Sequence, residues 1–146
     1  MSSVLTDRSD SHDSGLVLVY RDYLACLNER RWDELERFVA EEVQYNGERL
    51  GLRGYRAMLE ADTSAIPDLQ FVPELLVADG QVVSCRLFFE CSPQHAFLGF
   101  EPTGGRISFP EHVFYRFDSR RIVEAWSLID KEAIREQVSG GSPRRA

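Results

Sequence analysis

The segment from Arg106 to Asp130 constrains the fold more than any other part of this chain. Two stretches rich in aromatic and β-branched residues, 107–117 and 122–129, flank four polar residues of turn composition at 118–121. This composition predicts two long β-strands joined by a tight turn. We therefore expect the hairpin to form the centre of a curved sheet that helices cover.

The first predicted strand has two different faces, because side chains alternate along a strand. One face carries Phe109, Glu111, Val113, Tyr115 and Phe117. The other face carries Ser108, Pro110, His112, Phe114 and Arg116. We expect the first face to point toward the helices.

The turn decides which residues of the second strand share that first face, since a one-residue slip exchanges the faces. A three-residue loop at 118–120 would bring mostly small or apolar residues there: Val123, Ala125, Ser127 and Ile129. Glu111 would then lie opposite Ser127, and Val113 opposite Ala125. A two-residue loop at 119–120 would instead bring larger residues there: Glu124, Trp126 and Asp130. We favour the three-residue loop, while noting that its last position usually takes glycine and here holds Arg120.

In the favoured register, the first face has large aromatic residues at its ends and small residues in its middle. This arrangement leaves space between the sheet and the helices, into which Glu111 and Tyr115 would project. A hollow with a few convergent polar groups is typical of a ligand pocket. The alternative is a filled core in which Glu111 lies at a wet edge or pairs with an arginine.

Hydrophobic periodicity and turn residues predict the remaining elements. Helices are expected at 16–27, 32–39, 54–66 and about 131–138. Further strands are expected at 42–46, 69–78 and 81–91, with Asp79-Gly80 as the turn between the last two and Pro73 marking a strand edge or a bulge. Three helices followed by about four antiparallel strands predict an α+β domain with helices on one face of the sheet.

Length, charge and cysteine content narrow the class of protein. We expect one domain at 15–138 between disordered tails at 1–14 and 139–146. A net charge of −7 disfavours nucleic acid and anionic membranes as partners, and no apolar run is long enough to span a membrane. Cys26, Cys85 and Cys91 have no C-x-x-C spacing, which predicts reduced thiols in a cytoplasmic protein. The three scattered histidines predict no metal site.

Three segments of the chain carry a family pattern. They read Y-R-D-Y-L-A-C-L-N-E-R-R-W-D-E-L, E-P-T-G-G-R-I-S-F and Y-R-F-D-S-R-R-I-V-E-A-W-S-L-I-D. In this order and spacing, over residues 16–137, they resemble the SnoaL-like polyketide cyclases and the predicted ester cyclases. The resemblance implies the cone-shaped α+β fold named after nuclear transport factor 2. It also implies a deep pocket between sheet and helices, a homodimer, and no metal or organic cofactor.

The resemblance further implies chemistry at two positions of the final hairpin. In such cyclases an aspartate and a histidine in the last two strands perform acid–base catalysis, and an enolisable polyketide ester is closed by an intramolecular aldol step. An ungapped alignment places Val113 at the histidine position and Ser127 at the aspartate position. This chain therefore departs from the family at both positions, unless an alignment gap brings His112 or Asp130 there.

Glu111 is the candidate general base. A carboxylate on an apolar face loses hydration, and its pKa rises toward the range that suits proton abstraction next to a carbonyl. Arg86 lies in the middle of a predicted strand and needs an acidic partner or a ligand oxygen. Its partner could be Glu111, a bound ligand or Glu90, and the pairing with Glu90 would be purely structural.

Four further residues complete the candidate substrate-binding set. Tyr115 and Ser127 could donate hydrogen bonds to an enolate oxygen, or could be an ordinary core tyrosine and a small filler. Val113 would line the same pocket. His95, in the long loop at 92–105, could help to close the pocket mouth. His112 shares the outward face with Trp126, where a surface or subunit-interface role is expected.

These features predict a small, cofactor-free enzyme that acts on an apolar carbonyl compound by proton abstraction and enolate stabilisation. The alternative is a non-catalytic ligand-binding or dimerisation module of the same fold, which the departures at Val113 and Ser127 favour. Hydrolysis of an epoxide or lactone is a third hypothesis. It ranks last because the chain has no clear Asp–Arg–Asp arrangement to hold a water.

Overall fold

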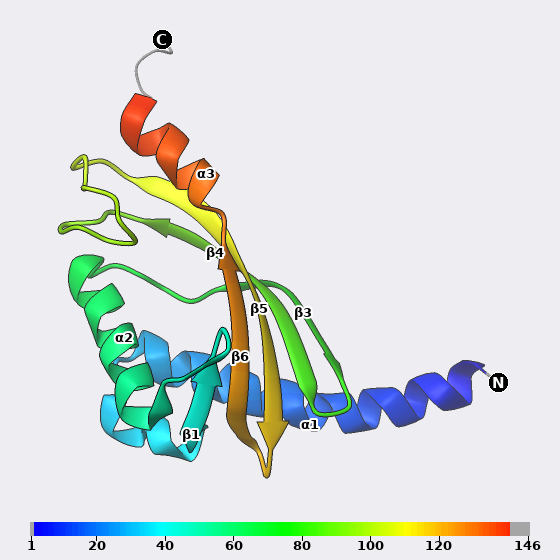
Figure 1. Cartoon of the computed structure of the whole chain (residues 1–146). Helices are drawn as coiled ribbons and strands as arrows, with labels where there is room; N and C mark the ends of the chain where they lie inside the picture. The colour runs from blue at the N-terminus through cyan, green and yellow to red at the C-terminus, as the bar shows by residue number, and fades with distance from the viewer. Residues whose placement is uncertain (1, 141–146) are drawn as a thin grey trace.

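The computed structural model describes residues 2–140, and the side chains of residues 15–139. The chain forms an α+β fold on one curved six-stranded sheet, with strand order β2-β1-β6-β5-β4-β3 (Figure 1). The strands are β1 (Val39–Tyr45), β2 (Glu48–Arg49), β3 (Pro73–Asp79), β4 (Val82–Cys91), β5 (Ile107–Asp118) and β6 (Arg121–Ile129). The predicted fold class is confirmed.

The helical segments precede, interrupt and follow the strands along the chain. They are α1 (Ser2–Asn28), the 3₁₀ helix η1 (Trp32–Arg37), α2 (Gly51–Ala65), α3 (Lys131–Arg135) and the short π-helical segment η2 (Glu136–Gly140). Figure 1 shows α1 running across the strands, α2 standing beside β1, and α3 continuing from the end of β6. Among the described residues, no helix is both long enough and apolar enough to cross a membrane.

Helix α1 packs against the sheet because its apolar residues recur every three or four positions. Leu16, Tyr20, Tyr23 and Leu27 are all buried in the core. The helix also includes residues 2–14, for which we predicted disorder, but the side chains of this part lie outside the described residues. Residues 141–146 of the predicted C-terminal tail lie outside them as well, so the division into one domain and two tails stays a prediction.

The second predicted helix, at 32–39, is wrong in its last residues. The 3₁₀ helix ends at Arg37, and the carbonyl of Phe38 accepts a hydrogen bond of 2.7 Å from the backbone N–H of Ile122. Val39 then pairs with Ile122 in a parallel ladder between β1 and β6. Because Phe38 and Val39 are already bonded to and paired with Ile122, the first strand begins at Val39 rather than at Glu42.

The β5–β6 turn has two residues, not the three that we favoured. Ser119 and Arg120 have φ values of 53° and 67°, and Asp118 pairs directly with Arg121. Two successive residues with positive φ are the mark of a type I′ turn, whose twist matches that of the flanking strands. The prediction of a three-residue loop was wrong because Ser119 as well as Arg120 adopts the left-handed conformation, although neither residue is glycine.

A bulge at Val123 then changes the register within β6. Phe117 pairs with Ile122, whereas Arg116 pairs with Glu124, so Val123 is the extra residue. Beyond the bulge, the inward residues are Ala125, Ser127 and Ile129, as the three-residue loop would have required. Their partners differ from that prediction, however: Glu111 lies opposite Ile129, Val113 opposite Ser127, and Tyr115 opposite Ala125.

Strand β3 forms the edge of the sheet opposite β2. Pro73 pairs with Leu87 and Leu75 with Arg86, so the register shifts directly after the proline. The predicted edge or bulge at Pro73 is confirmed, because proline cannot donate to a regular ladder. The three cysteines are buried and free, as predicted.

Candidate active site

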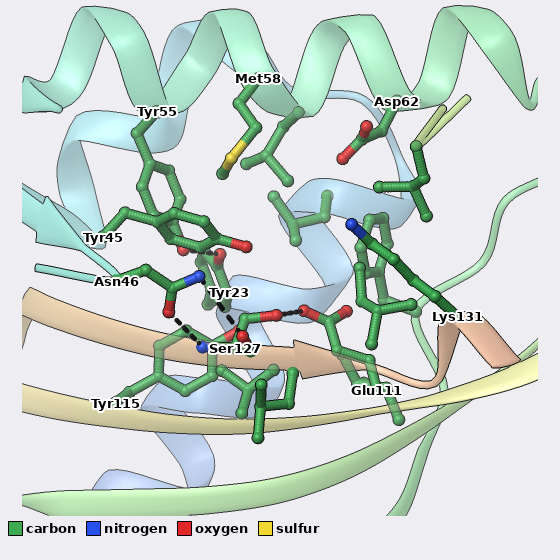
Figure 2. A pocket seen from close by; sticks show the side chains of 18 residues that line it. Tyr23, Tyr45, Asn46, Tyr55, Met58, Asp62, Glu111, Tyr115, Ser127 and Lys131 are labelled. Atoms are coloured by element: carbon green, nitrogen blue, oxygen red, sulfur yellow. Dashed lines mark hydrogen bonds between the residues drawn. The ribbon is translucent and has the colours of Figure 1, made fainter. Parts of the chain in front are cut away.

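A cavity of about 560 Å³ lies between α2 and the inner face of the sheet (Figure 2). Residues of α1, β1, α2, β5, β6 and α3 line it, so distant parts of the chain converge there. Figure 2 shows three charged side chains directed into this space: Asp62 from α2, Glu111 from β5 and Lys131 from the first turn of α3. The cavity is within the size range of small-molecule sites.

Glu111 faces the cavity because β5 alternates its side chains, and Val113 and Tyr115 face the same way. The hydroxyl of Ser127 donates a short hydrogen bond to Oε2 of Glu111. Ser127 reaches it diagonally across the ladder, since its direct partner is Val113. The bond, drawn as a dashed line in Figure 2, orients one carboxylate oxygen. Among the described residues, no hydrogen bond reaches the other oxygen, so a ligand could bond to it.

Asn46, in the turn directly after β1, holds Ser127 in place. Its side-chain Oδ1 accepts a hydrogen bond of 2.8 Å from the backbone N–H of Ser127, and its Nδ2 donates one of 3.3 Å to the Ser127 carbonyl. Asn46 adopts a left-handed conformation with φ of 50° at the turn after β1, a conformation that asparagine tolerates well. This turn therefore supports the hydrogen bond between Ser127 and Glu111.

Burial gives the two carboxylic acids of the cavity unusual proton affinities. Burial raises the pKa of Glu111 to about 7, while the Ser127 hydrogen bond lowers it and the charge of Asp62 raises it further. Burial likewise raises the pKa of Asp62 to about 6. Both shifts follow from the cost of placing a negative charge where water is scarce. A carboxyl group with a pKa near 7 can both take up and return a proton at neutral pH.

All five tyrosines of the chain gather around this cavity, and four of them line it: Tyr23, Tyr45, Tyr55 and Tyr115. The hydroxyl groups of Tyr23 and Tyr55 share a hydrogen bond of 2.7 Å. The fifth, Tyr20, packs with its ring centre 5.1 Å from that of Tyr115. Burial raises the pKa of Tyr23, Tyr55 and Tyr115 above the usual value, so these phenols stay protonated and can donate hydrogen bonds at neutral pH.

A carboxylate whose pKa is raised toward neutrality can accept a proton, and the phenols beside it can donate hydrogen bonds to a nearby oxygen atom. The family model of the SnoaL-like polyketide cyclases matches residues 17–138. The chain belongs to this family. The resemblance carried by the three sequence segments is thereby confirmed.

Solved structures agree with the fold, and one of them agrees with the family assignment. A SnoaL-like polyketide cyclase from Agrobacterium tumefaciens is 45% identical, has a TM-score of 0.81, and is matched over 84% of this chain and 97% of its own. TsrD from Streptomyces laurentii shares the fold at 22% identity, with a TM-score of 0.77 and coverage of 86% and 96%. IdmH from Streptomyces antibioticus does so at 18% identity, with a TM-score of 0.75 and coverage of 86% and 99%. Among curated proteins, none matches the chain.

The two positions that the SnoaL resemblance singled out lie next to each other in the cavity. Val113 and Ser127 are direct partners across the β5–β6 ladder, and both line the cavity. A histidine and an aspartate at these positions would touch. Here one side chain is apolar, and the other is a hydroxyl bound to Glu111. The carboxylate of this cavity therefore lies on β5, at Glu111, rather than at the aspartate position of β6, which Ser127 occupies.

Arg86 does not lie in the cavity of this SnoaL-like protein. It pairs with His112 across the β4–β5 ladder and so shares the outer face of the sheet, opposite to Glu111. There it donates a hydrogen bond of 2.6 Å to Glu74, and its Nη1 lies 2.7 Å from Nε2 of His112. The expectation that Arg86 pairs with Glu90 or Glu111 is wrong, because Glu74 of edge strand β3 reaches it first.

His95 lies in the predicted long loop, but its side chain is exposed and does not line the cavity. Leu98 of the same loop does line it, in a left-handed conformation with φ of 51°. The loop thus contributes an apolar side chain to the site rather than an imidazole.

Sequence reasoning missed six polar residues of the site: Tyr23, Tyr45, Asn46, Tyr55, Asp62 and Lys131. A signal existed for Asp62, since it follows Tyr55 and Met58 along one face of α2 at helical spacing. Asn46 read only as a turn residue, and Lys131 only as the residue after the helix cap Asp130. Among the described side chains, those of residues 15–139, no three His, Cys, Asp or Glu residues form a group that could hold a metal ion.

Proposed function

We propose that this SnoaL-like protein is an enzyme that acts on an apolar carbonyl compound by proton abstraction and enolate stabilisation. The observation that carries the proposal is Glu111, a carboxylate inside an otherwise largely apolar and aromatic cavity, with a pKa of about 7 and one oxygen held by Ser127. In its ionised form, Glu111 is suited to accept a proton at neutral pH.

In the proposed reaction, Glu111 removes a proton from the carbon next to the substrate carbonyl. The C–H electron pair moves into the C–C bond, and the carbonyl oxygen becomes an enolate. The phenol of Tyr115 or a neighbouring tyrosine donates a hydrogen bond to this oxygen. In a cyclisation, the enolate carbon attacks a second carbonyl, and the resulting alkoxide takes the proton back from Glu111. Protons and electrons balance without any oxidant or cofactor.

The simplest test uses 2-tetralone, an apolar ketone with acidic C–H bonds that fits a cavity of this size. Proton NMR in D₂O measures how fast its α-hydrogens exchange. We expect the wild-type protein to accelerate exchange at neutral pH, and Glu111→Gln to lose about 100-fold or more of this acceleration. Glu90→Gln is the matched control, because Glu90 is an exposed glutamate on the adjacent strand. Full activity of Glu111→Gln would remove the mechanism.

A non-catalytic ligand-binding module is the second candidate function. It is supported by the departures from the family pattern at Val113 and Ser127, where a histidine and an aspartate would act. Native mass spectrometry of the purified protein tests it. A retained apolar ligand, together with no acceleration of exchange in the wild type, would favour this candidate over the enzyme.

We further propose that the protein is a homodimer that associates through the outer face of the sheet. Large apolar side chains lie exposed there: Leu75, Val77, Phe114, Trp126 and Leu128. Phe114 and Trp126 are direct cross-strand neighbours, and Leu128 is 79% exposed. An apolar patch of this kind on one sheet face is typical of subunit interfaces. The three free thiols support a reducing, cytoplasmic location.

A further inference from the structure

Lys131 is the only lysine of the chain, since the other 16 basic residues are arginines. It is also the only cationic side chain among the described residues that line the cavity. Lys131 directly follows Asp130, whose side chain caps α3 by accepting a hydrogen bond of 3.0 Å from the Ala133 N–H. This cap fixes the first turn of α3 at the end of β6 and so places Lys131 at the edge of the cavity.

The ammonium group of Lys131 points into the space between Asp62 and Glu111 (Figure 2). Among the described residues, it forms no ion pair or hydrogen bond with either carboxylate or with any other group. Five arginines contrast with it, since all make ion pairs of 3.3 Å or less: Arg31, Arg56, Arg86, Arg116 and Arg135. The charge of Lys131 is thus available to a ligand.

The charges that line the cavity indicate which kind of ligand would bind to the Lys131 ammonium group. Without Lys131, an anionic group entering this space would meet only the like charges of Asp62 and Glu111. With Lys131, the anion gains a charge-assisted hydrogen bond. The raised pKa values of Glu111 and Asp62 also allow a proton to be taken up as an anion binds.

We propose that Lys131 binds an anionic oxygen of the ligand, so that the cavity selects compounds with an acidic oxygen on an apolar body. This inference rests on the proposed function, because the ligand that Lys131 binds is the substrate from which Glu111 removes a proton. The oxygen is either a carboxylate that the ligand already carries or the enolate that forms when Glu111 acts. Both present a delocalised negative charge to the ammonium group.

The test compares 2-naphthoate with its neutral isostere 2-naphthamide by isothermal titration calorimetry. We expect the wild type to prefer naphthoate. Lys131→Met should weaken naphthoate binding about tenfold or more, while naphthamide affinity changes less than about twofold. Lys131→Arg should keep most of the preference, because it keeps the charge. Arg121→Met, which removes an exposed charge at the opposite end of β6, is the control.

A second readout follows Lys131 itself. Reductive ¹³C-methylation keeps the lysine charge and gives a single lysine signal in NMR, because the chain has one lysine. Naphthoate should shift this signal and naphthamide should not. A naphthoate preference that Lys131→Met leaves unchanged, or a lysine signal that naphthoate never moves, would overturn the inference.

Hydrogen exchange of 2-tetralone distinguishes the two possible anionic oxygens, a carboxylate of the ligand and the enolate. If Lys131→Met slows exchange, the ammonium stabilises the developing enolate. If exchange is unaffected while naphthoate binding falls, the ammonium recognises a carboxylate of the ligand. Failure of the proposed function is distinguishable from failure here: Glu111→Gln would then leave exchange intact, while the Lys131-dependent preference for naphthoate would persist.

Discussion

At position 111, burial and a hydrogen bond act on one carboxyl group in opposite directions. Burial raises its pKa, and the hydroxyl of Ser127 lowers it. The resulting pKa of about 7 depends both on the burial of Glu111 and on its hydrogen bond from Ser127. A carboxylate in the open would titrate near 4.5 and would be a weak base.

Asp62 is the neighbour that most simply tests this balance. Its negative charge raises the pKa of Glu111, so Asp62→Asn should lower that pKa. The ionised, active form of Glu111 would then persist to lower pH. We expect the rising limb of the pH–rate profile for 2-tetralone exchange, centred near pH 7 in the wild type, to move to lower pH in Asp62→Asn. A profile that stays in place, or moves upward, would contradict the assignment.

At the scale of elements, the turn after β1 controls the site although it makes no contact with the proposed reacting atoms. Asn46→Gly removes both hydrogen bonds to the Ser127 backbone and keeps a residue that accepts positive φ. We expect a loss of about 1–2 kcal/mol in the free energy of unfolding, measured by urea denaturation. Exchange activity should fall as well, since Ser127 no longer orients Glu111 firmly.

Asn46→Asp separates the two contributions. It keeps the oxygen that accepts from the Ser127 N–H and loses the donor to the Ser127 carbonyl. Its stability should lie between those of the wild type and Asn46→Gly. Equal stability of all three proteins would show that this turn does not support β6.

The same elements show how far sequence reasoning reaches. The alternation of apolar and polar residues in β5 is local, so it correctly predicted that Glu111, Val113 and Tyr115 share one face. The bulge at Val123 was not predictable in this way, because it lies where a distant part of the chain, Phe38 and Val39, bonds to and pairs with Ile122. The prediction therefore identified the inward residues of β6 beyond the bulge but not their partners, and it missed that Ile122 is buried.

The site itself was predicted only where one hairpin supplies it. Glu111 and Ser127 come from the hairpin at 107–129, whose strands the sequence pattern predicted directly. Asp62, Asn46 and Lys131 come from three other elements, and their convergence depends on tertiary packing. Arg86 was misplaced for the same reason, since its partner Glu74 lies on a strand whose register shifts at Pro73.

At the scale of the whole molecule, the curved sheet has one face for the cavity and one for a partner. Phe114→Glu places a charge at the centre of the exposed apolar patch, where desolvation in an interface would be costly. We expect light scattering after size exclusion to report a dimer for the wild type and a monomer for Phe114→Glu. Leu18→Glu is the control, because Leu18 is an exposed leucine on α1 rather than on the sheet. A wild-type monomer would contradict the proposal.

We infer that the Glu111 carboxyl group lies in a water-poor cavity and has a pKa of about 7. The most direct measurement is ¹³C NMR of protein labelled at the glutamate δ-carbon, with Glu111→Gln used to assign the signal. We predict that the Glu111 signal titrates with a midpoint near pH 7. A midpoint near 4.5, the value of a solvated glutamate, would contradict the account.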